Sequence, residues 1–424
     1  MNAPLLFEPP RGMRDFYPED MDVRRVVFDA WAQAALQFGF CQYDACVVES
    51  LELLKRKSGE EIVDQIYSFK DKSDRDLALR PEMTPSLARM IVARQGALSF
   101  PLKWFAIAQC FRYERTTKGR KREHYQWNLD VVGEDSLGAE AEILACALNA
   151  LSRLGLDAGD VQVHYNSRAL LAELFLKANI PKECHAAVFL AIDKRGKIPD
   201  DEIRILLQNA GLDNNAVEAA FKIISLNTLE EARYFLGDKT PAFAAVEELP
   251  QRLADYGLGS SLRFDIGVVR GLGYYTGIVF EAYAVQHKMR AIFGGGRYDR
   301  LLSDIGGREM TAVGLGFGDV VIADLLCDSG KAGQLAGENK VDLAIGFMEE
   351  VQRSAAVRLA QEWRKSGKRV DLALRPEKAK NFFGRVGRGG VAEAVYIGPD
   401  DFASGTLRLK NLRDRSERQI ALPA

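Results

Sequence analysis

The residues with the clearest chemical potential lie in one cationic segment, residues 111–122 (FRYERTTKGRKR). Six cations fall within eleven residues there: Arg112, Arg115, Lys118, Arg120, Lys121 and Arg122. The segment separates two apolar stretches, residues 102–113 and 126–132, that we expect to be strands. Arginine forks bind the paired oxygens of phosphates and carboxylates. The segment therefore predicts a site for a polyanionic ligand, with a solvated charge run on a long hairpin loop as the alternative.

The second of these stretches carries polar side chains on one face. Gln126, Asn128 and Asp130 alternate with apolar residues, and successive side chains of a strand point to opposite faces. Arg112 and Glu114 alternate in the same way on the first stretch, where an ionic pair is costly unless it has a partner. A polar pocket beside the cations would satisfy both groups.

The cationic segment resembles motif 2 of the class II aminoacyl-tRNA synthetases, in the form found in the histidyl-tRNA synthetase family. Five further segments resemble that family in the order it requires. They are residues 10–15 (PRGMRD), 79–84 (LRPEMT), 270–277 (RGLGYYTG), 295–299 (GGRYD) and 314–318 (GLGFG). In turn they resemble its N-terminal signature, its amino-acid-binding turn, its histidine-specific loop, a later strand and motif 3. The resemblance spans essentially the whole chain.

The resemblance implies a histidine–tRNA ligase activity, in which ATP activates histidine before its transfer to tRNA(His). The attacking carboxylate and the α-phosphate are both anionic, so their repulsion must be cancelled. Arg112 and Arg270 are the implied catalytic residues, one on each side of the α-phosphate. ATP is also expected to contact Glu114 through adenine, Arg120 through its distal phosphates, and His124 by stacking. Mg²⁺ is expected with the pyrophosphate moiety, although the sequence shows no dedicated metal ligands.

The resemblance also implies a pocket for L-histidine. Glu82, Thr84 and Gln126 would accept hydrogen bonds from the α-ammonium group. Asp130 and Tyr275 stand at the positions that meet the two imidazole nitrogens, one with a carboxylate and one with a hydroxyl. The full set of predicted histidine-binding residues is Glu82, Thr84, Gln126, Asp130, Arg270, Tyr274, Tyr275 and Tyr298.

Several positions depart from the family pattern. Cys46 stands where motif 1 usually has a proline, and Gly273 replaces the usual acid of the histidine loop. His124 stands where a phenylalanine is more frequent, and Asp130 where the family often has the longer Glu. Motif 3 normally ends with an arginine that holds the γ-phosphate, but residues 318–322 (GDVVI) contain none. Pyrophosphate binding is therefore expected to depend on Arg120 and neighbouring cations.

The elements that must position these residues divide the chain into three regions. Residues 1–325 predict an α+β catalytic domain of the class II synthetase type, an antiparallel sheet flanked by helices. Its expected strands include residues 40–48, 66–70, 77–79, 102–113, 126–132 and 278–284. Amphipathic patterns over residues 161–255 predict a helical insertion, which the resemblance assigns to the tRNA acceptor arm. Residues 328–340 are typical of a linker. The alternating runs of residues 341–424 predict an α/β domain, which the resemblance implies is of the anticodon-binding kind.

The charge balance excludes a uniformly basic surface. The chain has 57 basic and 59 acidic residues, yet residues 341–424 contain 16 basic and 11 acidic residues. A local surface for tRNA therefore stays possible. The sequence lacks an apolar stretch of membrane-spanning length and a signal-peptide pattern, and its six scattered cysteines favour reduced thiols. We expect a cytoplasmic protein without a membrane partner, and the resemblance implies a homodimer.

Other classes of protein fit the sequence less well. Residues 314–318 lack the spacing of a dinucleotide-binding loop, and Cys184, His185 and His164 lack the spacing of zinc ligands. Two alternatives share most of the motifs. The first is a non-catalytic paralogue that senses histidine and regulates ATP phosphoribosyltransferase, although such proteins usually lack the C-terminal domain. The second is a synthetase-like protein that binds tRNA without charging it, which the missing motif 3 arginine keeps open.

Overall fold

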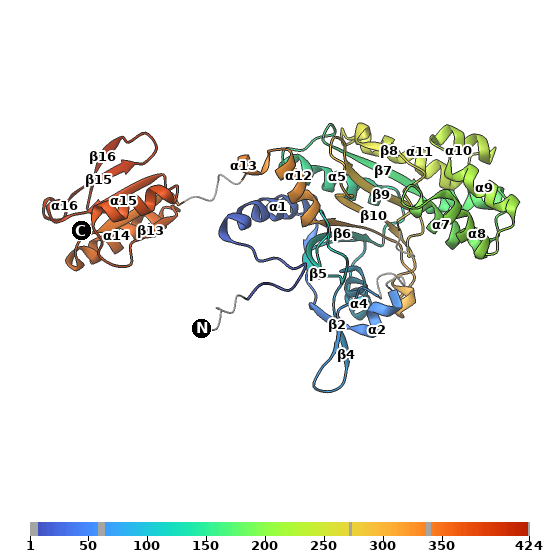
Figure 1. Ribbon diagram of the computed structural model, residues 1–424, viewed down its shortest axis with the longest axis horizontal. Coiled ribbons are helices and arrows are strands. Elements are labelled where there is room, and N and C mark those ends of the chain that lie inside the picture. Colours follow the sequence, from blue (N-terminus) through green and yellow to red (C-terminus); the bar gives the residue numbers. More distant parts are fainter. Residues whose placement is uncertain (1–6, 58–63, 271–273, 336–340, 423–424) are drawn as a thin grey trace, which may run out of the picture. The chain divides into compact units, whose positions relative to one another are not determined.

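The computed structural model describes residues 7–57, 64–270, 274–335 and 341–422 (Figure 1). The chain forms two compact units, Met1–Gly333 and Gln334–Ala424. The division falls within residues 328–340, where the sequence predicts a linker. Two helices, α12 (Asp319–Asp328) and α13 (Ala332–Leu335), enter that region. All six cysteines are free, and none of the helices in the described ranges is long and apolar enough to cross a membrane.

The first unit is built on an eight-stranded sheet with the order β1-β5-β6-β11-β10-β9-β7-β8. Its strands are β1 (Cys41–Gln42), β5 (Leu102–Phe111), β6 (Glu123–Val132), β7 (Val161–Ser167), β8 (Leu262–Phe264), β9 (Ile278–Ala284), β10 (Phe293–Tyr298) and β11 (Ala312–Gly318). The strands pair antiparallel except for the edge pairs β1–β5 and β7–β8. The predicted antiparallel sheet is confirmed, and such a sheet can bury one face while the other stays open.

One face of this sheet packs against α1 (Pro18–Gln37), α5 (Gly138–Arg153) and α12. Trp31 of α1 stacks on Trp127 of β6, with 6.0 Å between ring centroids, and tilts against Phe317 of β11 at 5.1 Å. All three rings are buried. Because side chains alternate along a strand, the residues between these aromatics point to the opposite face. Gln126, Asn128 and Asp130 of β6 therefore lie on the face of the sheet opposite the helices.

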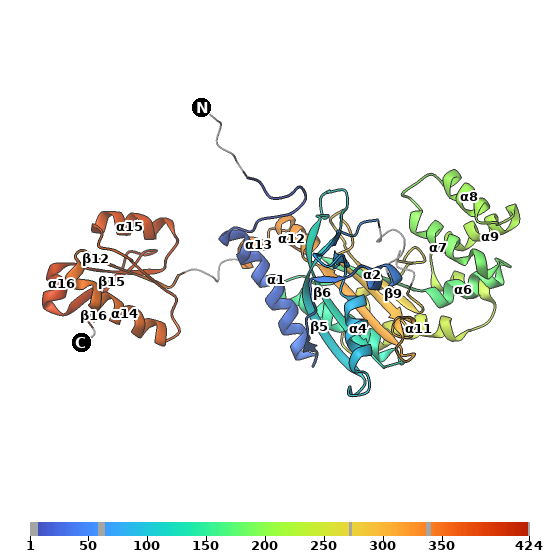
Figure 2. The same ribbon diagram turned by 90° about the horizontal axis from the view of Figure 1, so that it is seen from below.

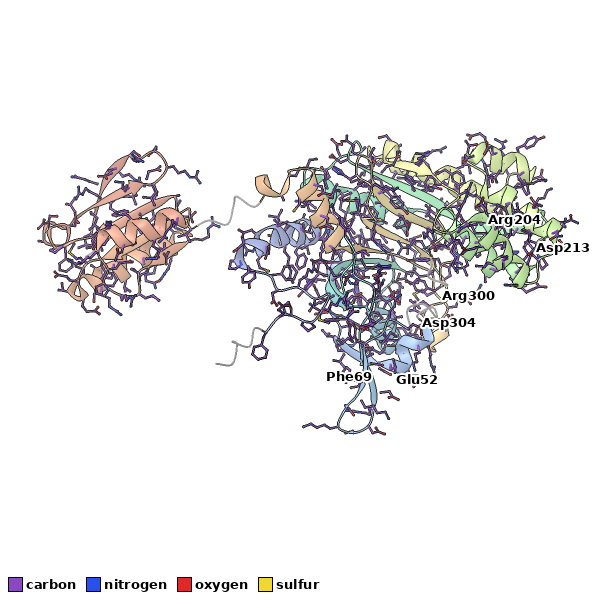
Figure 3. The ribbon with its side chains drawn as sticks, viewed as in Figure 1. Glu52, Phe69, Arg204, Asp213, Arg300 and Asp304 are labelled. Atoms are coloured by element: carbon purple, nitrogen blue, oxygen red, sulfur yellow. The ribbon has the colours of Figure 1, made fainter. Side chains whose placement is uncertain are left out.

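A separate three-stranded sheet lies beside the main one, in the order β2-β4-β3. Its strands are β2 (Val48–Ser50), β3 (Ser68–Lys70) and β4 (Asp76–Leu79), with helices α2 (Leu51–Lys57) and α4 (Thr84–Arg94) nearby. The expectation that residues 66–70 and 77–79 join the main sheet is wrong. A tight connection pairs these two short strands with each other, and β3 is exposed along its length. Phe69, for example, is an exposed aromatic of β3 (Figure 3).

The helical segment begins later than the sequence predicts. Residues 161–167, placed in the insertion by the sequence, form β7 between β9 and β8 of the main sheet. The helices are α6 (Arg168–Lys177), α7 (His185–Lys194), α8 (Asp200–Asn209), α9 (Asn214–Ile224), α10 (Leu229–Leu236) and α11 (Pro241–Ala254). Ser167 caps the first of them by accepting a hydrogen bond from the Leu170 amide at 3.3 Å. In both ribbon views α7, α8 and α9 gather beyond one edge of the sheet (Figures 1 and 2).

The second unit is a five-stranded sheet in the order β13-β12-β14-β15-β16, flanked by helices. Its elements are β12 (Leu343–Phe347), α14 (Arg353–Lys365), β13 (Val370–Leu372), α15 (Ala379–Arg388), β14 (Glu393–Ile397), α16 (Pro399–Ser404), β15 (Thr406–Asn411) and β16 (Glu417–Ala421). The α/β fold is confirmed. The sheet is mixed, however, because β12 runs parallel to both neighbours whereas β15 and β16 return antiparallel.

Candidate active site

A cavity of about 340 Å³ opens on the face of the main sheet that α1, α5 and α12 leave free. All twelve of the predicted site residues line it. They are Glu82, Thr84, Arg112, Glu114, Arg120, His124, Gln126, Asp130, Arg270, Tyr274, Tyr275 and Tyr298. They come from segments far apart in the sequence, so the fold brings together the residues that the motifs single out.

Glycines of two central strands form the floor of this cavity. The glycines at positions 294–296 and at 314, 316 and 318 lie inside β10 and β11. Gly314 pairs with Asp130, and Gly316 with Asn128, across β11 and β6. A Cβ on Gly314 would collide with the Asp130 carboxylate, and one on Gly316 with the Gln126 amide. Glycine is usually unfavourable in strands, but here its absent side chain makes the volume of the pocket.

One end of the cavity is rich in unpaired hydrogen-bond acceptors. The Tyr298 hydroxyl donates to Oδ1 of Asp130 at 2.7 Å. Oδ2 of Asp130, Oε1 of Gln126 and Oδ1 of Asn128 are buried without a hydrogen-bond partner. Burial also raises the pKa of Asp130 to about 7. Buried acceptors without partners are unfavourable, so this end is matched to a ligand that carries several N–H donors.

Tyrosines and Glu82 close this acceptor end. The Tyr274 hydroxyl donates to Oε2 of Glu82 at 3.4 Å, and Glu82 is 3% exposed. The ring of Tyr274 lies 4.8 Å from that of Tyr275 and 5.8 Å from that of Tyr298. Thr84, the first residue of α4, is buried beside them. The three tyrosine rings therefore form one wall of the cavity, and the Glu82 carboxylate lies beside them.

The other end of the cavity is cationic. Nε of Arg112 donates to the Pro81 carbonyl at 3.0 Å, which orients the guanidinium. Arg270 has φ of 55°, a conformation that side chains other than glycine adopt rarely and often at functional sites. Nη1 of Arg270 lies 3.2 Å from Oε1 of Glu281, and Oε2 of the same carboxylate accepts from the Tyr283 hydroxyl. Both guanidiniums are thus held in place before any ligand arrives.

The remaining cationic-segment residues are arranged differently from the expectation. Arg112 and Glu114 follow the end of β5 in a tight turn, with the Glu114 amide bonded to the Arg112 carbonyl at 2.8 Å, so they do not alternate on a strand. Glu114 is buried and forms an ion pair with Arg120. Burial, with Arg112 nearby, lowers the pKa of His124 to about 3. His124 is therefore a neutral ring that can stack but carries no charge at neutral pH.

The N-terminal signature supports this site from outside. Nε of Arg14 lies 2.6 Å from Oε1 of Glu123 at the start of β6, and its Nη2 lies 2.9 Å from Oδ2 of Asp319 at the start of α12. Asp319 also accepts from the Tyr125 amide at 2.9 Å. The carbonyl of Gly12 accepts from the Arg122 amide at 2.8 Å. The N-terminal signature thereby connects the end of the cationic segment to the start of β6 and the start of α12.

Five polar residues of the cavity were not among the predicted site residues. They are Gln65, Lys121, Asn128, Glu281 and Arg290. Asn128 shares the polar face of β6, and Lys121 belongs to the cationic segment, so the pattern already pointed to them. Gln65, Glu281 and Arg290 reach the site from elements distant in sequence, and no local pattern marks them.

The departures from the family pattern have different outcomes. Cys46 is exposed in the connection before β2, with its Sγ 3.7 Å from Oε2 of Glu49. Gly273 lies outside the described residues.

The histidine and cysteine considered as zinc ligands have other partners. Nδ1 of His164 lies 2.8 Å from Oδ2 of Asp265, and Sγ of Cys184 donates to the Ala210 carbonyl at 3.3 Å. Among the described residues, no group of three or more His, Cys, Asp or Glu could hold a metal ion.

The fold and the site define a class II aminoacyl-tRNA synthetase. The solved structure of histidyl-tRNA synthetase from Nostoc sp. PCC 7120 shares this fold, with a TM-score of 0.81 and 21% identity over 98% of this chain and 97% of that one. The model of the family described as histidyl-tRNA synthetase matches residues 12–318. A protein of Arabidopsis thaliana named histidine–tRNA ligase, chloroplastic/mitochondrial, is 40% identical over 414 residues, which are 98% of this chain and 85% of the relative. The histidine–tRNA ligase of Opitutus terrae is 37% identical over 420 residues, 96% of this chain and 94% of the relative.

The chain belongs to the histidyl-tRNA synthetase family.

Proposed function

We propose that this chain is a histidine–tRNA ligase, which activates L-histidine with ATP and transfers it to the 3′ end of tRNA(His). The observation that carries the proposal is one cavity with two chemically opposite ends. The acceptor end suits an ammonium group and an imidazole, and the cationic end suits a polyphosphate. Family membership and the names of the relatives agree with this substrate pair.

L-histidine occupies the acceptor end in this proposal. Its ammonium group meets Glu82, Thr84 and Gln126, and one imidazole nitrogen donates to the free Oδ2 of Asp130. Tyr275 provides the hydroxyl for the other nitrogen, while Tyr274 and Tyr298 enclose the ring. A site built on these hydrogen bonds rejects isosteric side chains, because the wrong ligand leaves buried acceptors unpaired.

ATP occupies the cationic end, bound as its Mg²⁺ complex. Mg²⁺ usually reaches nucleotide sites through the phosphates, and it belongs here to the nucleotide substrate. Adenine lies against His124 and Glu114. Arg120 then exchanges its ion pair with Glu114 for contact with the distal phosphates. Because Glu114 is buried, adenine must supply the donor that replaces the lost guanidinium.

The chemical step joins the two ends. A carboxylate oxygen of histidine attacks the α-phosphorus, the bond to the bridging oxygen breaks, and pyrophosphate leaves. Arg112 and Arg270 stabilise the charge that develops at the α-phosphate, and their fixed orientation limits reorganisation during the step. In the second step the tRNA 3′-terminal ribose hydroxyl attacks the histidyl carbonyl and AMP leaves.

The tRNA requires contacts outside this cavity. We assign residues 341–424 to the anticodon, because basic residues outnumber acidic ones there, and we assign the helical segment from α6 to α11 to the acceptor arm. The domain division at 1–325, 328–340 and 341–424, the homodimer and the cytoplasmic location stay predictions. Light scattering of the purified protein tests the dimer.

Charging of tRNA(His) with radiolabelled histidine tests the proposed function. Purified full-length chain should attach histidine to tRNA(His) and leave other tRNAs uncharged. A folded chain that binds tRNA(His) without attaching histidine would support the tRNA-binding alternative and contradict the ligase. A chain that binds histidine but neither ATP nor tRNA would instead support the regulatory paralogue.

A further inference from the structure

Arg290 lies just before β10 and lines two neighbouring cavities. One is the main cavity, and the other has a volume of about 290 Å³. Gly119, Arg290 and Val321 line both. A Cβ on Gly119 would lie 3.5 Å from Cγ2 of Val321 and 3.6 Å from Cδ of Arg290. The loop of the cationic segment, the start of α12 and Arg290 therefore meet at one point, where the two cavities adjoin.

The carboxylates that act electrostatically on Arg290, those of Glu114 and Glu281, are each paired with another arginine. Within the described residues Arg290 makes no hydrogen bond and no ion pair, whereas the neighbouring Arg120 is paired with Glu114. Burial lowers the pKa of Arg290, and the positive charge of Arg120 lowers it further. The second cavity is also lined by Lys118, Lys288 and Asp324. Lys118 is paired with Asp328 at 2.9 Å, whereas Lys288 and Arg290 make no ion pair within the described residues. Their positive charge is therefore available to a bound anion.

A triphosphate is an anion of suitable charge and length. Within the cationic end, Cζ of Arg270 lies 5.8 Å from the ring centroid of Tyr275, which belongs to the acceptor end. With the α-phosphate between Arg112 and Arg270, the phosphates that leave extend towards Arg120 and Arg290. The segment at residues 318–322 carries no arginine, and the apolar Val321 from this segment lines the same two cavities as Arg290. Within the main cavity, a guanidinium from the loop before β10 thus lies where α12 contributes only the apolar residues Val320 and Val321.

We propose that Arg290 binds the terminal phosphate of ATP, and hence the pyrophosphate product, at the junction of the two cavities. The inference rests on the proposed function, because it assigns a residue to the nucleotide substrate of that reaction. Arg290 makes a two-pronged contact to phosphate oxygens, with Arg120 on the preceding phosphate. Lys288 adds a positive charge along the path by which pyrophosphate leaves.

Equilibrium binding of ATP, pyrophosphate and AMP to the full chain, with Mg²⁺ present, tests this inference. Arg290→Ala should weaken ATP and pyrophosphate binding by about tenfold to a hundredfold, as expected for lost hydrogen bonds between charged groups. AMP binding should not change, because AMP lacks the terminal phosphates. Arg290→Lys should be intermediate, since it keeps the charge and loses the fork. Arg263→Ala, which removes an exposed arginine of β8 outside both cavities, is the matched control and should change none of the three affinities.

Two results would overturn the inference. One is unchanged ATP binding in Arg290→Ala, and the other is an equal loss of ATP and AMP affinity, which would indicate general damage to the site. The proposed function fails separately, if the wild-type chain binds ATP but shows no histidine-dependent pyrophosphate exchange. In that case the three affinities still decide whether Arg290 contacts the terminal phosphate.

Discussion

Asp130 is the residue whose environment most directly connects burial with substrate choice. Its carboxyl group is buried. Oδ1 accepts a hydrogen bond from the Tyr298 hydroxyl, and Oδ2 has no hydrogen-bond partner. The resulting pKa of about 7 means that the free protein exchanges a proton near physiological pH. An N–H donor placed on Oδ2 would favour the ionised carboxylate. In the proposed function, histidine binding is therefore linked to the release of a proton from Asp130.

This linkage predicts a pH dependence for histidine binding. Below pH 7 Asp130 is protonated in the free protein and accepts poorly, so the KM for histidine should rise by about tenfold between pH 8 and pH 6. The KM is measured in the pyrophosphate exchange reaction. In Asp130→Asn the component with a pKa near 7 should disappear, which leaves only the ionisation of the substrate itself. An unchanged pH profile in this variant would contradict the assignment of Asp130.

At the scale of elements, the β11 glycines show how a strand can create a pocket by lacking side chains. Gly316 and Gly318 lie two residues apart on β11 and both line the cavity. A Cβ on Gly316 would collide with the Gln126 amide, whereas a Cβ on Gly318 would meet nothing within 4 Å. Substituting each glycine in turn therefore distinguishes an effect on the shape of the pocket from an effect on the stability of the strand.

Gly316→Ala should therefore displace Gln126 and raise the KM for histidine by about tenfold, the effect of one lost hydrogen bond to a charged group. Thermal stability should change little, because the end of a flexible side chain can move aside. Gly318→Ala should leave the KM for histidine unchanged. Equal effects of the two substitutions on this KM would show that the Gly316 position does not shape the pocket.

The N-terminal signature joins β6 and α12 through Arg14. Removing this guanidinium leaves the carboxylates of Glu123 and Asp319 buried without their cation. Arg14→Ala should lower the free energy of unfolding in urea by about 3 kcal/mol at pH 8. Burial already raises the pKa of Asp319, so protonation of the carboxylates should reduce this loss towards pH 5.

The exposed pair of Arg25 and Asp22, with 3.7 Å between Nη1 and Oδ1, provides the control. Arg25→Ala should change the unfolding free energy by less than about 0.5 kcal/mol. If the two variants lose equal stability, or the loss in Arg14→Ala does not depend on pH, the proposed role of Arg14 is wrong.

These elements also show what the sequence could and could not predict. The alternation of Gln126, Asn128 and Asp130 predicted their common face, because the period of a strand is a local property. The local pattern does not predict that glycines lie inside β10 and β11, although the family resemblance already assigned residues 295–299 to a strand. Glycine alone indicates a turn or loop, and only the approach of Gln126 and Asp130 from the neighbouring strand explains its presence in a strand.

The same limit applies to the partners of the charged residues. Arg270 and the cationic segment were recognised from their motifs, but nothing local predicts that Glu281 holds Arg270 or that Arg120 pairs with Glu114. The three-stranded sheet was missed because its strands are three or four residues long. An alternation of apolar and polar residues over three or four positions is too short to indicate which strand each one pairs with.

At the scale of the whole molecule, the proposed function assigns the chemistry to the first unit and tRNA selection to the second. Every residue of the cavity belongs to the first compact unit. A chain of residues 1–333 should therefore retain histidine-dependent pyrophosphate exchange. Its charging of tRNA(His) should fall by about a hundredfold or more, because the contribution of a second, tethered binding site is lost. Full charging activity of this shortened chain would contradict the role assigned to residues 341–424.

Pyrophosphate exchange by the purified full-length chain tests the central claim most directly. Labelled pyrophosphate should be incorporated into ATP in the presence of L-histidine, and L-phenylalanine or L-glutamine should support no incorporation. This result is expected because only histidine pairs the buried acceptors at one end of the cavity while its carboxylate faces the cations at the other. A folded chain that binds L-histidine and ATP but catalyses no exchange would contradict the account.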